Sequence, residues 1–189
     1  MIHINISHLD YPKAIEKLQN ILHQNTNDIF ECHLDFSADH TKSKIIRDFI
    51  GTIFDFYNIH HPWRWRFILI TDELINNAIE HWSRTGDTDS CIIQAGKNNN
   101  DEFFIELEVH DTGNGKDSKD AKHMNKIKED RLHSENTEDG VYMEKRGRGL
   151  FHITEKLVDK LSFSESPKGG LAVKIEKRIP SNDNTLASL

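Results

Sequence analysis

Asp72-Glu73-Leu74-Ile75-Asn76-Asn77-Ala78-Ile79-Glu80-His81 (DELINNAIEH) is a stretch in which polar residues interrupt an apolar run with helical spacing. It follows the letters RFILIT, so a helix is expected from about Trp63 to Trp82. At about 100° per residue, the apolar residues gather on one side of this helix: Ile68, Ile75, Ala78, Ile79 and Trp82. A separate arc gathers the polar residues Glu73, Asn77, Glu80 and His81. The stretch therefore predicts one buried stripe and one distinct polar stripe.

The polar stripe has two interpretations. A solvated helix face is the ordinary one, since most polar helix faces simply meet water. Solvated faces favour Lys, Glu, Gln and Arg, however, whereas Asn77 is a poor residue in the middle of a helix because its amide competes with the backbone. Two further motifs lie downstream in the chain, and they weigh against the solvated face.

The first of them is His110-Asp111-Thr112-Gly113-Asn114-Gly115 (HDTGNG), at the exit of a predicted strand. The Asp111 carboxylate can accept a hydrogen bond from an exocyclic amine such as that of adenine. Gly113 and Gly115 let the backbone pass close to a flat ring and take positive φ where needed. The same letters also make a good turn, and the motif taken by itself favours a plain turn.

The second is Lys145-Arg146-Gly147-Arg148-Gly149-Leu150 (KRGRGL), before the helix-like letters FHITEKL. Glycines at the start of a helix expose unpaired N–H groups and the positive end of the helix dipole, which suits a phosphate group. The basic side chains around the glycines add positive charge. A simple loop hinge is the alternative for such a pair of glycines.

In this order and spacing, ExxxNAxxH on a helix, DxGxG after a strand and GRGL before a helix resemble the GHKL superfamily of ATPases, which includes gyrase, heat-shock chaperones, histidine kinases and mismatch-repair proteins. Within it, the chain most resembles the anti-sigma-factor serine/threonine kinases of bacterial partner-switching systems. The features of that branch are His81 at the end of the first motif, LVDKLSF after GRGL, and FSAD in the strand and helix before. The resemblance covers roughly residues 29–179 and implies the Bergerat fold.

The resemblance implies a role for each part of the polar stripe. Asn77 resembles the residue whose amide oxygen binds Mg²⁺, with phosphate oxygens and water as the other ligands. Glu73, one turn earlier, resembles the general base or positioning carboxylate for the incoming hydroxyl. His81 would lie near the phosphate end of ATP and orient groups there rather than react.

The resemblance also implies contacts with ATP in the other two motifs. Asp111 would read the adenine amine, with Gly113 and Gly115 allowing the approach of the ring. Residues 116–146 would form the ATP lid. The phosphates would bind to the KRGRGL motif, at Gly147, Arg148, Gly149 and Leu150. ATP and Mg²⁺ are therefore the expected cofactors.

The chain departs from the family pattern at two places. Lys116 follows the second glycine of DxGxG, where a bulky apolar residue is usual. Leu171 and Ala172 stand where a threonine is common near the adenine site. A nucleotide pocket can persist after phosphotransfer has been lost, so these departures bear on activity more than on the fold.

Three functions compete. The first is a serine/threonine kinase that phosphorylates a STAS-type anti-anti-sigma protein and, in its other partner state, sequesters a sigma factor. The second is a partner-switch regulator that is catalytically weak or inactive and uses ATP, if at all, as a structural ligand. The third is the catalytic piece of a histidine kinase, for which the chain before the strand at residue 29 is too short to hold a phosphoacceptor hairpin.

The periodicity of the rest of the chain predicts an α+β fold, a two-layer sandwich of a mixed, largely antiparallel sheet with helices on one face. Alternating apolar residues predict the strands, around residues 2–6, 29–37, 90–96, 103–110, 161–163 and 171–175. Helical spacing predicts the helices, over residues 10–22, 41–57, 63–82 and after 149. The charged segment 116–146 has little periodicity and is expected to be a mobile loop.

The domain prediction has three parts: an N-terminal extension (1–28), a histidine-kinase-like ATPase domain (29–179) and a flexible tail (180–189). The helix expected in the extension is a candidate contact for a homodimer or another partner.

Composition narrows the class of protein. The formal net charge of −7 argues against nucleic acid as the main partner. No apolar run is long enough for a membrane span. Cys32 and Cys91 are far apart and outside any CxxC pattern, which favours reduced thiols in a cytoplasmic protein. Twelve histidines occur, but they form no HExxH or Cys/His motif, so the motifs do not favour a histidine metal site.

Overall fold

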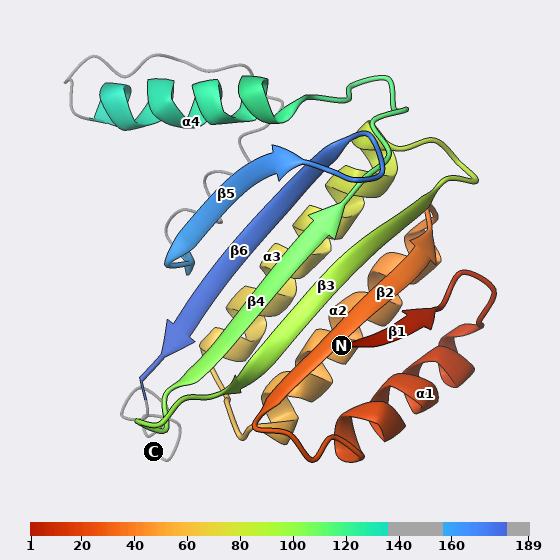
Figure 1. Cartoon of the computed structure of the whole chain (residues 1–189), viewed down its shortest axis with the longest axis vertical. Helices are drawn as coiled ribbons and strands as arrows, with labels where there is room; N and C mark the ends of the chain where they lie inside the picture. The colour runs from red at the N-terminus through yellow and green to blue at the C-terminus, as the bar shows by residue number, and fades with distance from the viewer. Residues whose placement is uncertain (136–156, 181–189) are drawn as a thin grey trace.

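The computed structural model describes the backbone of residues 1–135 and 157–180, and the side chains of residues 1–130 and 157–180. Within these residues, helices α1, α2 and α3 cover one face of a six-stranded sheet (Figure 1). The elements are β1 (Ile2–Asn5), α1 (Tyr11–His23), β2 (Ile29–Ser37), α2 (His40–Phe56), α3 (Trp63–Asn77), the π-helical turn η1 (Ala78–Trp82), β3 (Thr88–Lys97), β4 (Phe103–His110), α4 (Ala121–Glu135), β5 (Lys160–Glu165) and β6 (Leu171–Ile179). The predicted α+β class, with helices on one face of a mixed sheet, is confirmed.

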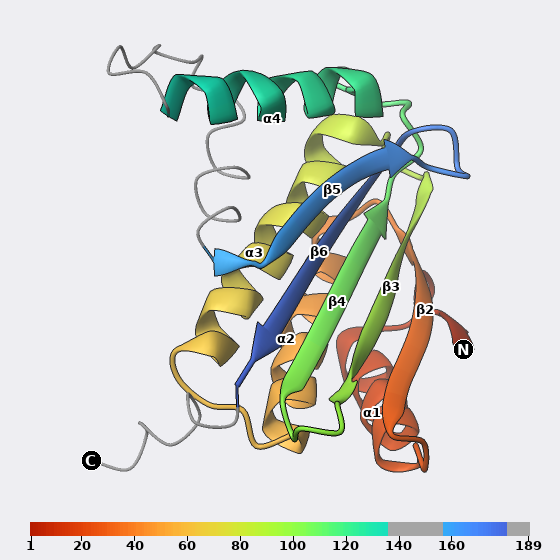
Figure 2. The same cartoon turned by 60° about the vertical axis from the view of Figure 1, so that its left-hand side comes forward.

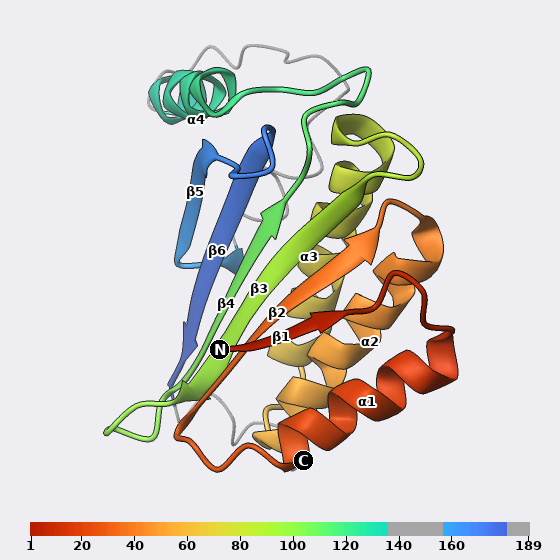
Figure 3. The same cartoon turned by 45° about the vertical axis from the view of Figure 1, so that its right-hand side comes forward.

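The sheet has the strand order β1-β2-β3-β4-β6-β5. β1 pairs with β2 in parallel, and the other neighbouring strands are antiparallel. Successive side chains of a strand point to opposite faces, and the alternation in β2 buries one set against the helices: Phe30, Cys32, Leu34 and Phe36. His33 and Asp35 consequently point to the opposite face of the sheet. Figure 3 shows α1, α2 and α3 together on one side of the strands.

The helix α2 supplies the centre of the core. The Asp39 carboxylate caps its start by accepting a hydrogen bond from the Thr41 backbone N–H at 2.9 Å. Its apolar stripe is fully or almost fully buried against the sheet and α3: Ile45, Ile46, Phe49, Ile50, Ile53 and Phe54. This packing fixes where α3, and with it the polar stripe, lies relative to the sheet.

Residues 1–28 extend both layers of the sandwich. Ile4 of β1 lies opposite Leu34 of β2, so the sheet gains an edge strand. The helix α1 begins at an Asp10 cap and packs beside α2, with Ala14, Leu18 and Leu22 completely buried. The strand and helix expected in this region are both confirmed.

The segment expected to be a mobile loop contains the helix α4, so that prediction is wrong over residues 121–135. The carboxylate of Asp120 accepts a hydrogen bond from the His123 backbone N–H at 2.7 Å, as in a helix cap. Among the described side chains of α4, those of residues 121–130, only Ala121 and Met124 are buried, so this part of the helix has too narrow an apolar stripe to show in the sequence as amphipathic. Its position comes from tertiary contacts instead.

Those contacts are made with β5, the edge strand of the sheet. The Asn125 amide donates to the Phe163 carbonyl oxygen at 3.2 Å, and Lys128 Nζ donates to the Leu161 carbonyl oxygen at 2.5 Å. The side chains of α4 thereby occupy carbonyl groups that an edge strand leaves open. Figure 2 shows α4 at the end of the sheet where β4 ends and β6 begins.

Several predictions concern residues outside the described part of the chain. They are the remainder of the lid, the helix expected after residue 149, and the flexible tail from residue 181 onward. Among the described helices, none combines the length and the apolar character that crossing a bilayer requires.

Candidate functional site

Three segments meet at the end of the sheet where β4 finishes. The loop after β4 hydrogen-bonds to η1, because the Gly115 N–H donates to the Trp82 carbonyl oxygen at 2.9 Å. The same loop reaches β6, because the Asp111 N–H donates to the Leu171 carbonyl oxygen at 3.1 Å. The structure therefore brings two of the predicted motifs together, the polar stripe of α3–η1 and HDTGNG.

Asp111 is 1 % exposed at the centre of this junction. Its Oδ1 accepts hydrogen bonds from the backbone N–H groups of Gly113 at 2.8 Å and Leu171 at 3.2 Å. Its Oδ2 is buried and has no hydrogen-bond partner in the described part of the chain. A buried acceptor without a donor costs free energy, so a ligand amine placed here gains a strong hydrogen bond. This oxygen fits the predicted reader of adenine.

Burial also changes the ionisation of Asp111. Removal from water raises the pKa of its carboxyl from 3.8 to about 6, although the backbone N–H groups of Leu171 and Gly113 oppose the rise. The group is therefore ionised at neutral pH and able to accept a hydrogen bond at both oxygens, but it becomes protonated under mildly acidic conditions.

The glycines around Asp111 are required by contacts between protein segments. Gly113 has φ +71°, and a Cβ there would lie 2.9 Å from the Gly170 Cα. A Cβ at Gly115 would overlap the His81 carbonyl oxygen, and one at Gly170 would overlap Asp111 Oδ1. The sequence interpretation gave Gly113 and Gly115 the task of admitting the adenine ring. The described contacts show that they admit neighbouring backbone, and contact with a ring stays a prediction.

The helix predicted over residues 63–82 is present, but its last turn widens into the π-helical turn η1. Across this turn the Ser83 N–H donates to the Ala78 carbonyl oxygen at 2.9 Å. The Asp117 N–H donates to the His81 carbonyl oxygen at 3.2 Å, while Gly115 binds the next carbonyl. The loop after β4 thus satisfies carbonyls that a helix end leaves free. π-helical turns occur frequently at functional sites.

His81 lies in η1 between two acidic side chains. Its Nδ1 is 3.6 Å from Asp117 Oδ2, and its Nε2 is 3.9 Å from Glu80 Oε2. Glu80 in turn lies 3.8 Å from His40 at the start of α2. His81 is half-buried and accessible from the polar side of the helix, which fits an orienting role better than a structural core position.

Glu73 and Asn77 are in contact on the same face of α3. The Asn77 Nδ2 donates to Glu73 Oε1 at 3.3 Å, and both side chains are half-buried. This contact turns the amide so that its oxygen, Oδ1, is the atom left for a cation. A neutral amide oxygen beside a carboxylate is a suitable ligand for Mg²⁺ that arrives already bound to phosphate.

Sequence reasoning missed a polar network behind Asp111. Ser83 Oγ donates to Asp89 Oδ1 at 2.5 Å, and the Thr112 N–H donates to Ser83 Oγ at 3.2 Å. Thr112 Oγ1 also donates to Asp87 Oδ2 at 2.6 Å. The network joins η1, the start of β3 and the loop after β4. It therefore holds Asp111 in place from the side opposite β6.

Asp89 is the buried acid of this network. It is 0 % exposed, and burial raises the pKa of its carboxyl to about 7, with the neighbouring charge of Asp111 adding to the rise. A signal for it was present in the sequence, because Asp89 falls on the same strand face as the apolar residues Cys91 and Ile93. A carboxylate on the core face of a strand marks a position with a special partner.

The model of the histidine kinase-like ATPase domain family matches residues 36–177, which is most of the chain. The chain belongs to this family. No curated protein gives a significant match. The match agrees with the resemblance to the GHKL superfamily. It supports ATP binding and, in general terms, ATPase or kinase activity. It does not distinguish the anti-sigma kinase branch from the others.

The two departures from the family pattern have clear positions in this ATPase domain. Leu171 and Ala172 are buried at the start of β6, and Leu171 contacts Asp111 through its backbone N–H and carbonyl groups. These two side chains offer no hydroxyl to a ligand. Lys116 is exposed on the loop that follows Gly115.

The phosphate half of the ATPase site lies outside the described residues. Its predicted members are Gly147, Arg148, Gly149 and Leu150. Their contact with phosphate stays a prediction. The predicted roles of Glu73, Asn77 and His81 in metal binding and phosphoryl transfer also stay predictions.

Proposed function

We propose that this ATPase domain is a serine/threonine protein kinase of a bacterial partner-switching system, acting as an anti-sigma factor and phosphorylating a STAS-type anti-anti-sigma protein. The observation that carries the proposal is the Glu73–Asn77 contact on α3, directly before the turn η1 on which the loop after Asp111 docks. A carboxylate one turn before a metal-binding amide is what phosphoryl transfer to a hydroxyl needs.

Each residue of the site has a distinct task in this proposal. Asp111 Oδ2 would accept a hydrogen bond from the adenine amine and so fix the nucleotide. Asn77 Oδ1 would hold Mg²⁺, which neutralises charge on the phosphates. Glu73 would orient the incoming serine or threonine hydroxyl and take its proton as the phosphoryl group transfers. Glycine N–H groups of the segment 147–150 would contact the phosphates.

The proposed partners are proteins. The phosphate acceptor is a STAS-type anti-anti-sigma protein, and in the other state of the switch the partner is a sigma factor. The net charge of −7 favours protein partners over nucleic acid. A cytoplasmic location fits Cys32 and Cys91, which are buried, unbridged thiols.

A second candidate is a nucleotide-binding regulator that has weak phosphotransfer or none. The buried aliphatic side chains of Leu171 and Ala172 favour it, because they stand where a hydroxyl is common near the adenine site. In this alternative, ATP would order the site for partner binding without transferring its phosphoryl group.

The adjacent pair Asn76 and Asn77 provides a matched test. Both are half-buried on α3, but only Asn77 lies on the polar stripe with Glu73. We would incubate wild type, Asn77→Ala and Asn76→Ala with Mg·ATP and the STAS-domain proteins of the same genome, and follow phosphoserine formation by mass spectrometry. The kinase proposal expects phosphorylation by wild type and Asn76→Ala and a loss of at least about a hundredfold in Asn77→Ala.

The same experiment separates the two candidates. Phosphorylation that persists in Asn77→Ala would overturn the site assignment. If wild type transfers no phosphate while Mg·ATP still raises its melting temperature, the binding regulator replaces the kinase. A ligand at a hundred times its Kd stabilises by about 2.7 kcal/mol, which is well within reach of a thermal scan.

A further inference from the structure

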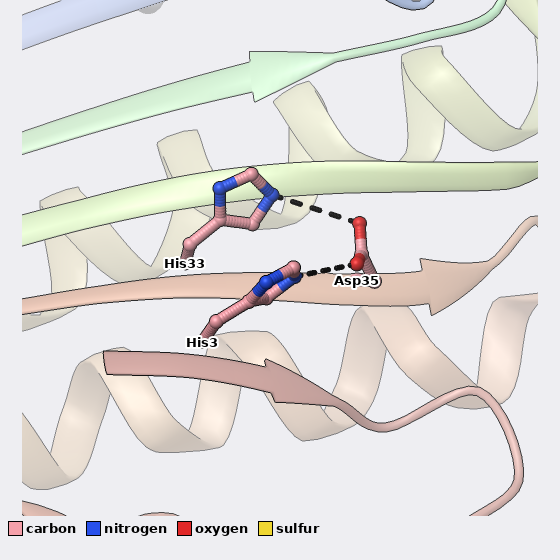
Figure 4. Close-up of side chains that lie close together, drawn as sticks. All are labelled: His3, His33 and Asp35. Atoms are coloured by element: carbon pink, nitrogen blue, oxygen red, sulfur yellow. Dashed lines mark hydrogen bonds and ion pairs between the residues drawn. The ribbon is translucent and has the colours of Figure 1, made fainter. Parts of the chain in front are cut away.

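We propose that His3, His33 and Asp35 form a binding site for a divalent transition-metal ion such as Zn²⁺, on the face of the sheet opposite helices α1, α2 and α3. Figure 4 shows the three side chains pointing toward one another from β1 and β2. One ligand atom from each residue lies within 4.8 Å of the other two. Two imidazoles and one carboxylate are a common ligand set for zinc in proteins.

The parallel register of β1 and β2 creates the cluster. His3 lies directly opposite His33, and the two rings are 4.5 Å apart between centroids. Asp35 is two residues further along β2 and therefore projects from the same face as His33. The three residues are held by backbone pairing, so the cluster forms as a consequence of the fold itself.

The distances suit an ion after a small movement. His3 Nε2 lies 2.6 Å from Asp35 Oδ2, and His33 Nε2 lies 3.6 Å from Asp35 Oδ1. A tetrahedral ion with bonds of about 2.0 to 2.2 Å places its ligand atoms roughly 3.3 to 3.6 Å apart. The His3 side chain is 62 % exposed, so its ring is free to swing outward by that amount. Its exposure also leaves the fourth position open to water.

An unpartnered nitrogen supports the site independently. The Nε2 atom of His33 is buried and has no hydrogen-bond partner in the described residues. It faces Asp35 at a distance too long for a hydrogen bond. Buried polar atoms are nearly always paired, and those that are not call for an explanation such as a bound ion.

Lys168 sets a condition on how the ion binds. Its Nζ donates to Asp35 Oδ1 at 3.2 Å and to the Thr88 carbonyl oxygen at 3.0 Å. The ion would therefore take Asp35 Oδ2, while Lys168 orients the carboxylate from the other oxygen, as outer groups do around many metal ligands. The positive charge of Lys168 moderates the affinity.

The ligand chemistry sets this site apart from the proposed magnesium site at Asn77. Imidazole nitrogen favours Zn²⁺, Co²⁺, Ni²⁺ and Cu²⁺, whereas Mg²⁺ and Ca²⁺ prefer oxygen ligands only. The ion would join β1, a strand of four residues, to its neighbour β2. Its structural effect is thus to hold the N-terminal edge of the sheet in place.

A second His-Leu-Asp segment of the chain serves as a control, because it has the same residues in a different structural setting. His8-Leu9-Asp10 repeats the letters of His33-Leu34-Asp35, but Asp10 caps α1 and pairs with Lys13. Chelator-treated wild type, His3→Gln, Asp35→Asn and His8→Gln would be titrated with Zn²⁺ by calorimetry in excess Mg²⁺. We expect one ion per chain in wild type and His8→Gln, and a loss of at least about tenfold in affinity in the other two.

Hydrogen exchange supplies the structural readout. Zn²⁺ is expected to slow amide exchange in residues 2–5 of wild type and His8→Gln, and to leave it unchanged in His3→Gln. His3 is exposed, so this variant should melt at the wild-type temperature in chelator, which separates lost binding from unfolding. The proposal is overturned if wild type binds no Zn²⁺, or if His3→Gln binds it as tightly as wild type does.

Discussion

Asp111 shows how one residue prepares a ligand site. Two backbone N–H groups hold Oδ1, and this fixes the carboxylate so that Oδ2 lies buried with no donor among the described residues. Asp89 lies in the network behind it, and its buried Oδ2 likewise has no partner within residues 1–130 and 157–180. Both carboxyls have a raised pKa because burial disfavours their charge. A donor from the ligand would favour the charged form of Asp111.

Asp111→Asn is expected to weaken nucleotide binding by roughly 5- to 150-fold, the equivalent of about 1 to 3 kcal/mol. The two N–H groups would hold the amide oxygen, so the amide NH₂ would face the adenine amine, donor against donor. Calorimetry with Mg·ADP measures the loss. An unchanged affinity would remove Asp111 from the adenine site.

The same carboxyl predicts a pH dependence. Between its unfolded value of 3.8 and its folded pKa of about 6, free folded protein holds the extra proton, so its free energy of unfolding falls as pH rises through this window. The affinity for an adenine ligand has the opposite trend and rises with pH, because the adenine amine donates its hydrogen bond to the ionised Asp111 carboxylate. Adenosine affinity should therefore drop as pH falls below about 6 in wild type and stay flat in Asp111→Asn. Adenosine lacks phosphates, whose own titration would interfere.

At the scale of elements, the junction between η1 and the loop after β4 decides the shape of the site. The loop satisfies carbonyls of the widened turn, and the close approach leaves no room for a side chain at Gly115. No proline or glycine inside residues 63–82 marks the change from α3 to η1. The sequence therefore predicted one continuous helix, and tertiary hydrogen bonds supplied the difference.

Gly115→Ala is expected to destabilise the fold by about 1 to 3 kcal/mol, because the added Cβ forces the loop away from the His81 carbonyl oxygen. Nucleotide binding should fall with it, since Asp111 moves with the loop. Urea unfolding and Mg·ADP calorimetry provide the two readouts.

Gly86→Ala is the matched control for that variant. Gly86 has φ +96° but open space around it, so alanine there adds backbone strain of about 1 to 3 kcal/mol without displacing a neighbour, and it should leave Mg·ADP binding unchanged. If Gly86→Ala weakened Mg·ADP binding as much as Gly115→Ala does, close packing at Gly115 would not be the cause of the lost binding.

At the scale of the whole molecule, residues from both ends of the described chain share one hydrophobic core. Leu18 and Leu22 of α1 belong to the same buried cluster as Phe103 of β4 and Ile175 of β6. Residues 1–28 therefore contribute to the stability of the ATPase sandwich. The predicted role of α1 in a homodimer involves its exposed side and remains a separate prediction.

Leu18→Ala is expected to lower the free energy of unfolding by about 2 to 4 kcal/mol, in a single transition that includes the whole sandwich. Lys17→Ala, at an exposed neighbouring position, should change it by no more than about 0.5 kcal/mol. Chemical denaturation followed by fluorescence and by circular dichroism tests both points. Two separate transitions would show that α1 unfolds independently of the rest.

The sequence by itself determined the strands and helices whose periodicity is strong, and with them the α+β class. It also placed Glu73, Asn77 and His81 on one helix face and Asp111 at the exit of a strand, since these are local relations along one segment. The helix α4 escaped detection because its contacts with β5, rather than an apolar stripe of its own, hold it.

Only the tertiary structure decided which segments meet. Three features depend on residues far apart in the chain: the burial of Asp111 Oδ2, the fit of Gly115 against η1 and the pairing of His3 with His33. Periodicity reports which side of a segment is buried, but it contains no information on strand register or loop docking. Strand register and loop docking are fixed by packing and hydrogen bonding between segments. They bring the residues of separate motifs together into one site.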